Sequence, residues 1–366
     1  MRFSPQGLLL GPCAPPAPPP LLLLLLALRL CAPIQWLGLA ASGGGLAWNE
    51  TQHCGQLDGL AAAAEPLAQL CRRHLELMPS VVQAARQTQG LCRKTFAGMR
   101  WNCSFVAGPR FAPQLLKGTR ESAFVYALAA AAVSHAIARA CASEQLPICS
   151  CGSAPSEEAP EPNSQWGGCG DNLHFGLQLG SAIADGAMKS SKAGPQVSRQ
   201  VNLHNNEAGR QVLVDSMETK CKCHGVSGSC SVQTCWKSLP DLAEVAWQLK
   251  ANYLAATKVT YRHVGSRKQL VPKDLDFRPL KVTELIYLIS SPDYCVKNPT
   301  LGSLGTQDRH CNKSSAGSDS CNLLCCGRGY NAYRESMEER CQCKYYWCCY
   351  VLCKKCQRVV ERYICK

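Results

Sequence analysis

The cysteine content constrains this chain more than any other feature. The 366 residues include 26 cysteines, of which two lie in an N-terminal leader and 24 in the remainder. An even number of cysteines in a chain bound for an oxidising compartment predicts a disulfide framework. Twelve lie between Cys54 and Cys235 and twelve between Cys295 and Cys365. We therefore expect two disulfide-bonded regions.

The leader has the features of a secretory signal peptide. Arg2 precedes an apolar run at 21–26, and small residues follow it. A transmembrane anchor is the alternative, but the uninterrupted apolar core ends at Arg29, short of the ~20 residues that a spanning helix needs. We expect residues 1–40 to be the signal peptide, removed together with its two cysteines, Cys13 and Cys31.

The cleavage position stays open between about residues 32 and 41. Pro33 disfavours a cut after Ala32, whereas Gly38 and Ala40 form a pair of small residues further on. The next apolar run, 123–133, is also too short to cross a bilayer, so we expect an exported and released protein.

Charge and sequons fit an extracellular location. The net charge of +13 falls to +11 when Arg2 and Arg29 leave with the leader. Basic residues gather at the C-terminus: Lys344, Lys354, Lys355, Arg358, Arg362 and Lys366. A heparan-type glycosaminoglycan is the expected acidic partner rather than nucleic acid, and a solvated basic surface is the alternative. N-glycosylation sequons occur at Asn49, Asn102 and Asn312.

The patterning divides the chain into three segments after the leader. Residues 41–256 read as a helical domain, with Val197, Val201, His204, Ala208 and Val212 and then Leu242, Val245, Ala246, Leu249 and Tyr253 at helical spacing. An Ala-rich helix is expected over 123–140, with Thr119 as its cap and Glu121 in its first turn.

Residues 257–291 alternate as β-strands, with Val259, Tyr261 and His263 before a Gly265-Ser266 turn and Leu270 and Val271 after it. Residues 292–366 have few apolar runs, so cross-links must supply much of their order.

A first cysteine hairpin spans 221–235. Nested pairing of Cys221 with Cys235 and of Cys223 with Cys230 clamps a loop with its tip at 225–229. The two pairs are offset differently, which predicts arms that cannot form a regular ladder and an asymmetric tip. Gly225 and Gly228 flank Ser227, permit positive φ and leave the Ser227 hydroxyl accessible to an enzyme.

Two other chemistries fit this hairpin less well. Gly225-Val-Ser-Gly-Ser229 resembles the nucleophile elbow of serine hydrolases, but Ser229 replaces the final glycine and no apolar strand leads into the turn. Zinc binding by Cys221 and Cys223, or by Cys341 and Cys343, lacks the usual Cys-x-x-Cys spacing, and only His224 lies close by as a nitrogen ligand.

A second cysteine hairpin spans 341–356. Pairing Cys341 with Cys356 and Cys343 with Cys353 gives antiparallel register with a one-residue offset, which predicts a bulge on the 353–356 arm. Cys348 and Cys349 then close on each other as a vicinal disulfide at the tip. That tip presents an apolar knob formed by Tyr346, Trp347, Tyr350 and Val351, which is typical of a binding surface.

In these motifs the chain resembles the Wnt family of secreted lipid-modified signalling glycoproteins. The resemblance covers Gln52 to Lys366 and is carried by Arg100-Trp-Asn-Cys103, Trp166-Gly-Gly-Cys169, His204-Asn-Asn-Glu-Ala-Gly-Arg210, Cys221-Lys-Cys-His-Gly-Val-Ser-Gly-Ser-Cys230 and the 341–356 hairpin. Thr119-Arg-Glu-Ser-Ala-Phe-Val-Tyr-Ala-Leu128 and Val271-Pro-Lys-Asp-Leu-Asp276 are similar to the Wnt eleven branch.

The resemblance implies a fold and a mode of action. A helical N-terminal domain carries a lipidated thumb, and a cystine-rich C-terminal domain carries an index finger. Together they grip the cysteine-rich domain of Frizzled receptors, with Ser227 and the fingertip residues Tyr346, Trp347, Cys348, Cys349, Tyr350 and Val351 in contact. The family also implies palmitoleoylation of Ser227 by a membrane-bound acyltransferase, escort by a carrier, and deacylation by an extracellular esterase.

The resemblance further implies signalling in cell polarity and morphogenesis from the extracellular space and matrix, with no catalytic residue, metal or cofactor beyond the acyl group and N-glycans. It implies these disulfides: Cys92 with Cys103, Cys141 with Cys149, Cys151 with Cys169, Cys295 with Cys326, Cys311 with Cys321, and Cys325 with Cys365. Cys54 and Cys71 remain and are paired by elimination. A disulfide-rich matrix or growth-factor-like protein without lipid is the alternative function.

Overall fold

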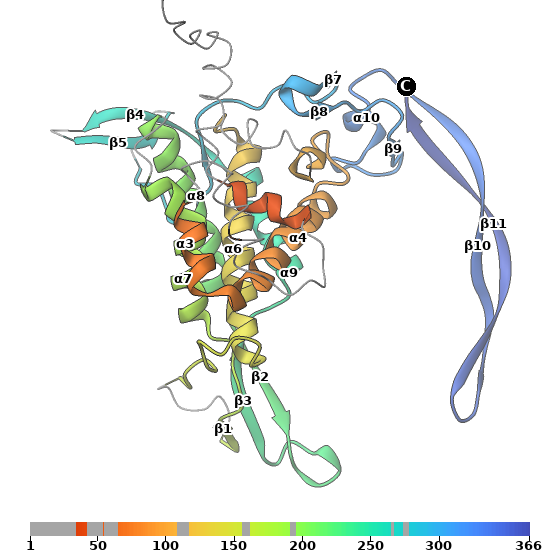
Figure 1. Ribbon diagram of the computed structural model, residues 1–366. Coiled ribbons are helices and arrows are strands. Elements are labelled where there is room, and N and C mark those ends of the chain that lie inside the picture. The colour runs from red at the N-terminus through yellow and green to blue at the C-terminus, as the bar shows by residue number, and fades with distance from the viewer. Residues whose placement is uncertain are drawn as a thin grey trace, which may run out of the picture.

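The computed structural model of the chain describes residues 34–41, 54, 65–107, 117–155, 162–190, 195–264, 267–273 and 278–366. Helices form the centre of the molecule, and β-hairpins project from it at different places (Figure 1). This mixture of helices, small sheets and many disulfides is the class that the sequence predicts. Most of the expected leader, residues 1–33, lies outside the described residues.

The helices gather in the N-terminal two-thirds of the chain. They are α3 (Glu65–Arg73), α4 (Met78–Thr95), α6 (Arg120–Ala142), α7 (Leu173–Ser190), α8 (Gln196–Asp215) and α9 (Leu242–Leu254), and short 3-10 turns lie at Gln35–Ala41 (η1), Leu75–Leu77 (η4) and Ser104–Ala107 (η5). The apolar spacings read from the sequence coincide with α8 and α9. These helices enclose the main hydrophobic core.

Helix α6 lies at the centre of this region and contacts α4, α7, α8 and α9. The Thr119 side chain accepts a hydrogen bond from the Ser122 amide, so the predicted cap is present. By length and composition this 23-residue helix is apolar enough to cross a membrane, contrary to the expectation from its shorter apolar run, but 94% of its apolar window is buried. It is a core helix.

Helix α8 approaches α6 very closely at Gly209. A Cβ atom added to Gly209 would collide with the Ala127 carbonyl of α6. The Arg210 guanidinium, on the next residue, donates to the buried Asp185 carboxylate of α7 at 3.0 and 3.2 Å. This part of the 204–210 motif therefore serves helix packing, since it brings α8 against both neighbours.

A three-stranded sheet continues from the helices into the first hairpin. Strands β2 (Glu218–Cys223) and β3 (Gln233–Ser238) are antiparallel, and β1 (Ser164–Trp166) pairs with β3 in parallel. Their ladder is regular from Glu218 opposite Ser238 to Cys223 opposite Gln233. The prediction of irregular arms was therefore wrong, because Cys230 lies beyond the ladder and the asymmetry is confined to the tip.

The segment after the helices forms the predicted strand pair. Strands β4 (Thr257–Val264) and β5 (Arg267–Pro272) are antiparallel with Tyr261 opposite Leu270, and β6 (Ile286–Tyr287) adds to β4 in parallel. The expected turn at 265–266 and the second half of the 271–276 motif, residues 274–276, lie outside the described residues.

The C-terminal region has very little apolar core. Its buried cluster consists of Cys321, Leu324, Cys325 and Cys365, with Cys311, Tyr330 and Tyr363 packed around it. Short elements lead into a long hairpin: β7 (Lys297–Asn298), η7 (Pro299–Leu301), β8 (Ser303–Leu304), β9 (His310–Cys311), α10 (Cys321–Leu324), β10 (Tyr330–Tyr346) and β11 (Tyr350–Cys365). This hairpin is much longer than the 341–356 span expected from its cysteines.

Hydrogen bonds join the C-terminal region to the helices. Arg309 donates to the carbonyl oxygens of Ala97 and Arg100 at 2.9 Å and of Met99 at 2.8 Å. Arg100 in turn donates to the carbonyl oxygen of Leu323 at 2.9 Å. Ala97, Met99 and Arg100 lie just after the C-terminal end of α4, where backbone carbonyls lack helical partners. The two guanidinium groups therefore fasten the cystine-rich region to the end of α4.

Eleven disulfides are present among the described residues, and each joins a predicted pair of cysteines. They are 54–71, 92–103, 141–149, 151–169, 221–235, 223–230, 295–326, 311–321, 325–365, 341–356 and 343–353. Cys311, Cys325 and Cys365 cluster like metal ligands. Their sulfurs belong to disulfides, as do those of the cysteines considered for zinc, so they have no thiolate to offer a metal.

Candidate functional site

The tip of the β2–β3 hairpin, called here the thumb, is a tight turn with Ser227 at its apex. Gly228 N donates to Gly225 O at 2.9 Å, and Ser229 N donates to Val226 O at 3.1 Å. The positive φ values belong to Ser227 itself, at 56°, and to Gly228, at 76°. Gly225 has extended backbone instead. It is needed for space, because an added Cβ would lie 2.5 Å from the Ser229 carbonyl oxygen.

The thumb tip is open to solvent on every residue from Val226 to Val232. Val226 is 90% exposed, beside the exposed Ser227 hydroxyl. An apolar side chain so exposed at the apex of a cross-linked turn packs against nothing in the fold, which suits a surface that is covered by a partner. Val226 is not among the residues predicted from the sequence, although it lies between Gly225 and Gly228.

The thumb shows no hydrolase machinery. A nucleophilic serine needs a base within hydrogen-bond reach. The Nε2 atom of the neighbouring His224 lies 3.0 Å from the Thr234 hydroxyl, and the Ser227 hydroxyl makes no hydrogen bond within the described residues. The geometry offers an accessible acceptor hydroxyl rather than an activated nucleophile.

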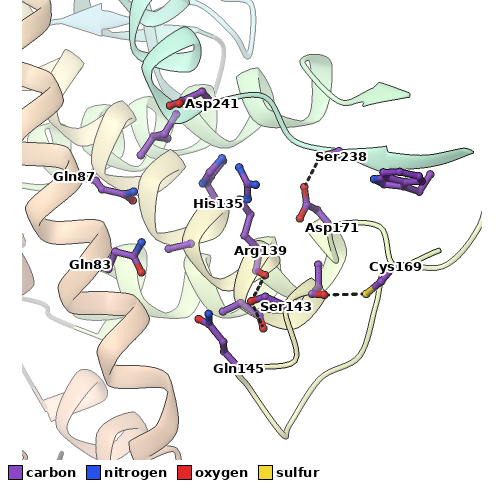
Figure 2. A pocket seen from close by; sticks show the side chains of 15 residues that line it. Gln83, Gln87, His135, Arg139, Ser143, Gln145, Cys169, Asp171, Ser238 and Asp241 are labelled. Carbon is purple, nitrogen blue, oxygen red and sulfur yellow. Dashed lines mark hydrogen bonds between the residues drawn. The ribbon is translucent and has the colours of Figure 1, made fainter. Parts of the chain in front are cut away.

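A second serine, histidine and aspartate set lines a cleft of about 500 Å³ at the base of the thumb (Figure 2). Ser238 donates to Asp171 at 3.1 Å, while the His135 Nε2 atom lies 2.9 Å from the Pro240 carbonyl. Burial lowers the pKa of His135. Because the serine hydroxyl is bonded to the carboxylate rather than to the imidazole, these three side chains do not form a nucleophilic relay.

The tip of the β10–β11 hairpin, called here the finger, carries a cluster of exposed apolar side chains. Tyr345, Tyr346, Trp347, Tyr350, Val351 and Leu352 are exposed there, Trp347 at 92%. The rings of Tyr346 and Tyr350 stack across the strands with centroids 5.2 Å apart. The structure thus gathers every predicted knob residue at one tip, and adds Tyr345 and Leu352.

The fingertip cysteines are free thiols in the structure. The Sγ atoms of Cys348 and Cys349 are 2.8 Å apart and hydrogen-bonded, and this bond raises the pKa of the Cys349 thiol. A disulfide would hold the sulfurs at about 2.05 Å. The expected vicinal bridge is therefore absent from the structure.

The finger contains a bulge, but on the other arm from the one predicted. Cys341 lies opposite Lys354 and Lys344 opposite Leu352, so two residues on β10 face one on β11. Gln342, one of the two, has φ of 45°. The prediction was wrong because Cys341 and Cys356 are not directly opposite: Cys341 lies opposite Lys354 and Cys356 opposite Glu339, so the spacing of the bridged cysteines does not reveal the strand register.

Carboxylates neutralise part of the basic stripe on the finger. Lys355 pairs with Glu338 at 2.7 Å, Arg358 with Glu339 at 3.9 Å and Arg362 with Glu335 at 3.2 Å. Lys344 and Lys354 have no ion pair within the part of the chain that the structure describes. The positive surface available to an acidic polymer is therefore smaller than the sequence suggests.

Two sequons show a shared local geometry. The Asn102 Oδ1 atom accepts from the Ser104 hydroxyl at 2.5 Å, and the Asn312 Oδ1 atom accepts from the Ser314 hydroxyl at 2.9 Å. Asn312 is exposed and Asn102 half-buried, and Asn49 lies outside the described residues. Asn312 is thus the more accessible of the two described acceptors.

Other family motif residues hold the fold together. The His204 Nε2 atom lies 2.8 Å from the Glu284 carbonyl oxygen, and the Asn205 side chain bonds both backbone polar groups of Ile286 at 2.9 and 3.0 Å. These contacts attach α8 to β6. Arg309, which fastens the two regions together, was missed because nothing in its local sequence indicates so distant a partner.

The protein has two cystine-clamped hairpins with exposed apolar tips, one carried by a helical region and the other by a cystine-rich region. This arrangement is that of a disulfide-stapled binding protein. A family model described as wnt family matches residues 60–366. Protein Wnt-11b-2 of Xenopus tropicalis is 65% identical over 340 residues, 92% of this chain and 95% of the relative. Protein Wnt-11 of Gallus gallus is 58% identical over 342 residues, 93% and 96% of the two chains.

The chain therefore belongs to the Wnt family of signalling ligands, within its Wnt-11 branch. A solved structure, human WLS in complex with WNT8A, contains a similar fold with a TM-score of 0.56 and 35% identity. The similarity covers 79% of this chain and 94% of that one.

Proposed function

We propose that this secreted ligand captures the cysteine-rich domain of a Frizzled-type receptor between its two hairpin tips. The observation that carries the proposal is the exposure of Val226 and Trp347, at 90% and 92%, on the tips of two separate cross-linked hairpins. Exposed apolar anchors on rigid supports contribute most to binding, because little ordering accompanies association. The two tips would grip one partner at two places.

At the thumb, Ser227 is the proposed site of palmitoleoylation. Its hydroxyl is exposed, makes no hydrogen bond to the part of the chain that the structure describes, and is held at the apex by the two thumb disulfides. A membrane-bound acyltransferase would transfer the acyl group from a thioester: the ester bond forms to Ser227 Oγ, the thioester C–S bond breaks, and the serine proton ends on the departing thiol. At ~0.8 kcal/mol per buried methylene, a chain of about sixteen carbons contributes on the order of 10 kcal/mol in an apolar groove, less the ordering of both partners.

At the finger, the proposed receptor contacts are Tyr346, Trp347, Cys348, Cys349, Tyr350 and Val351. The thiols of the two cysteines lie side by side between these apolar side chains, with their Sγ atoms 2.8 Å apart. Large aromatic side chains at such a tip suit an apolar receptor pocket. No catalytic group or cofactor takes part in this function.

Export and turnover follow from the same acyl group. A dedicated carrier would shield the lipid, as suggested by the neighbour in which WNT8A is in complex with WLS. An extracellular esterase would end signalling by hydrolysing the Ser227 ester.

N-glycans on Asn49, Asn102 and Asn312, and heparan sulfate bound at the basic finger, would act in the extracellular matrix. The branch suggests a role in cell polarity and morphogenesis.

The test is a pair of thumb variants in cells fed an alkyne-tagged fatty acid. Ser227→Ala should lose the label, most receptor affinity and carrier-dependent export, while the disulfides still form. Ser229→Ala is the matched control, because its hydroxyl lies two residues away and faces Ser231 at 3.3 Å. Label persisting on Ser227→Ala, or absence of acyl mass on the secreted protein, would instead support a disulfide-rich ligand without lipid.

A further inference from the structure

The C-terminal end of the expected leader, residues 34–40, is part of the folded core together with Ala41. Residues 34–41, of which Gln35–Ala41 form η1, pack against α4. Ile34, Trp36 and Leu37 are 3%, 3% and 0% exposed, and Leu39 is 9% exposed. Gly38, between the two leucines, faces solvent. One side of this short turn is therefore buried as completely as the central helix.

Polar side chains of α4 complete the contact. Gln89 donates from Nε2 to the Leu37 carbonyl oxygen at 3.0 Å, and Arg86 donates from Nε to the Ala40 carbonyl oxygen at 3.2 Å. A 3-10 turn of this length leaves carbonyls without internal partners, so both bonds satisfy groups that burial would otherwise leave unpaired. The segment and α4 are thus matched in apolar surface and in hydrogen bonding.

This packing conflicts with a cleavage site inside the segment. Signal peptidase hydrolyses one peptide bond, adding water to give a leader carboxylate and a new α-amino group on the mature chain. Cleavage after Ala40 or Ala41 would remove every one of these buried side chains and leave the face of α4 that they cover exposed to water. The small residues Gly38 and Ala40 resemble a cleavage signal but belong to the packed turn.

The cysteine count limits how far towards the N-terminus the cleavage site can lie. Eleven disulfides join 22 of the 24 cysteines that follow Cys31, and the other two, Cys348 and Cys349, lie next to each other as thiols at the fingertip. A cut on the N-terminal side of Cys31 would leave one extra cysteine in a secreted chain, where an odd thiol forms wrong pairs. Cleavage that removes Cys31 and keeps Ile34 in the mature chain can therefore occur at three peptide bonds, those between Cys31 and Ile34.

We infer that the leader is cleaved at one of the three bonds between Cys31 and Ile34, and that residues 34–41 are an N-terminal plug of the mature protein. The plug covers α4 and stabilises the helical region from its outer side. This inference does not depend on the proposed receptor function.

The direct measurement is the N-terminal sequence and intact mass of the secreted full chain after deglycosylation and reduction. The expected first residue is Ala32, Pro33 or Ile34. A first residue at Gln35 or later, or a mature chain that still contains Cys31, would overturn the assignment.

A second experiment tests the plug separately from the leader. The chain from Ile34 and the chain from Ser42 are each fused to the same unrelated secretory leader. We expect the shorter chain to lose most of its secreted yield, with the thermal midpoint of any recovered protein lower by at least about 5 °C. Equal yield and equal midpoint would show that the plug contributes nothing.

Point variants in the full chain give a matched pair. Leu37→Asp puts a charge at a fully buried position and should reproduce the loss of yield and midpoint. Gly38→Ser changes the neighbouring exposed position, where an added Cβ has no atom within 4 Å, and should leave both unchanged. Identical behaviour of the two variants would contradict the plug.

Discussion

The thumb and the finger present similar apolar tips, but the regions that carry them are held together differently. The thumb strands grow out of a large helical core in which α6 is buried along nearly its whole length. The finger strands start from a cluster of four buried residues, three of them cysteines. Packing therefore supports the region that carries the thumb, and covalent cross-links support the region that carries the finger, so the two regions should fail under different perturbations.

The largest effect is expected from removing the bridge at the base of the finger. Replacing Cys325 and Cys365 together by serine opens a disulfide between residues 40 apart in sequence and should cost about 4 kcal/mol in free energy of unfolding. Secretion should fail, because no apolar core compensates. Replacing Cys343 and Cys353, 10 residues apart near the tip, is the control and should cost less. Similar secretion of both variants would show that the C-terminal region has support other than this bridge.

The next largest effect belongs to the helical region. Gly209→Val places side-chain atoms where α8 touches the α6 backbone and should destabilise the protein by about 3 kcal/mol, measured by chemical denaturation. Gly90→Ala, in α4 with open space around it, should be neutral or slightly stabilising. If Gly209→Val unfolded no more easily than Gly90→Ala, tight packing would not distinguish this region.

A smaller effect on binding, with none on folding, is expected at the finger. Trp347→Ala should keep the thermal midpoint but weaken binding to a Frizzled cysteine-rich domain by roughly 2 kcal/mol, as expected for an aromatic anchor. Trp247→Ala on α9 also removes an exposed tryptophan and should leave binding unchanged. Equal losses would mean that the fingertip is not a specific contact.

The smallest effect concerns the segment that joins the two regions. Hydrogen bonds donated by Arg278 and Thr257 lower the pKa of Glu284 to about 2, from 4.5. The ionised carboxylate therefore stabilises the fold above pH 4.5, and this contribution is lost as the pH falls towards 2. Because Arg278 is 45% exposed, solvent screening limits it to about 1 kcal/mol.

Glu284→Gln should remove this pH dependence. Denaturation midpoints of the variant and of the unchanged chain should differ at pH 6 and converge below pH 3. A constant difference across that range would assign the stability to packing rather than to the ion pair.

The sequence alone determined the features that depend on short-range pattern. The α6 helix and its Thr119 cap, the nested thumb bridges and the aromatic fingertip all follow from residues within a few positions of one another. Such features are decided by backbone geometry and by local side-chain size, which the order of residues already contains. The family motifs added the distant disulfide pairs that spacing by itself leaves open.

Only the tertiary structure decided the features that depend on residues distant in sequence. The finger extends to Tyr330 because its exposed strands need no apolar alternation, so no periodicity marked their start. Arg309 donates to carbonyl oxygens of residues more than two hundred positions away in sequence. Trp36 is buried against α4, although the segment that contains it has the composition of a leader. In each case the deciding contact forms between segments that chain folding brings together, and local sequence carries no record of that partner.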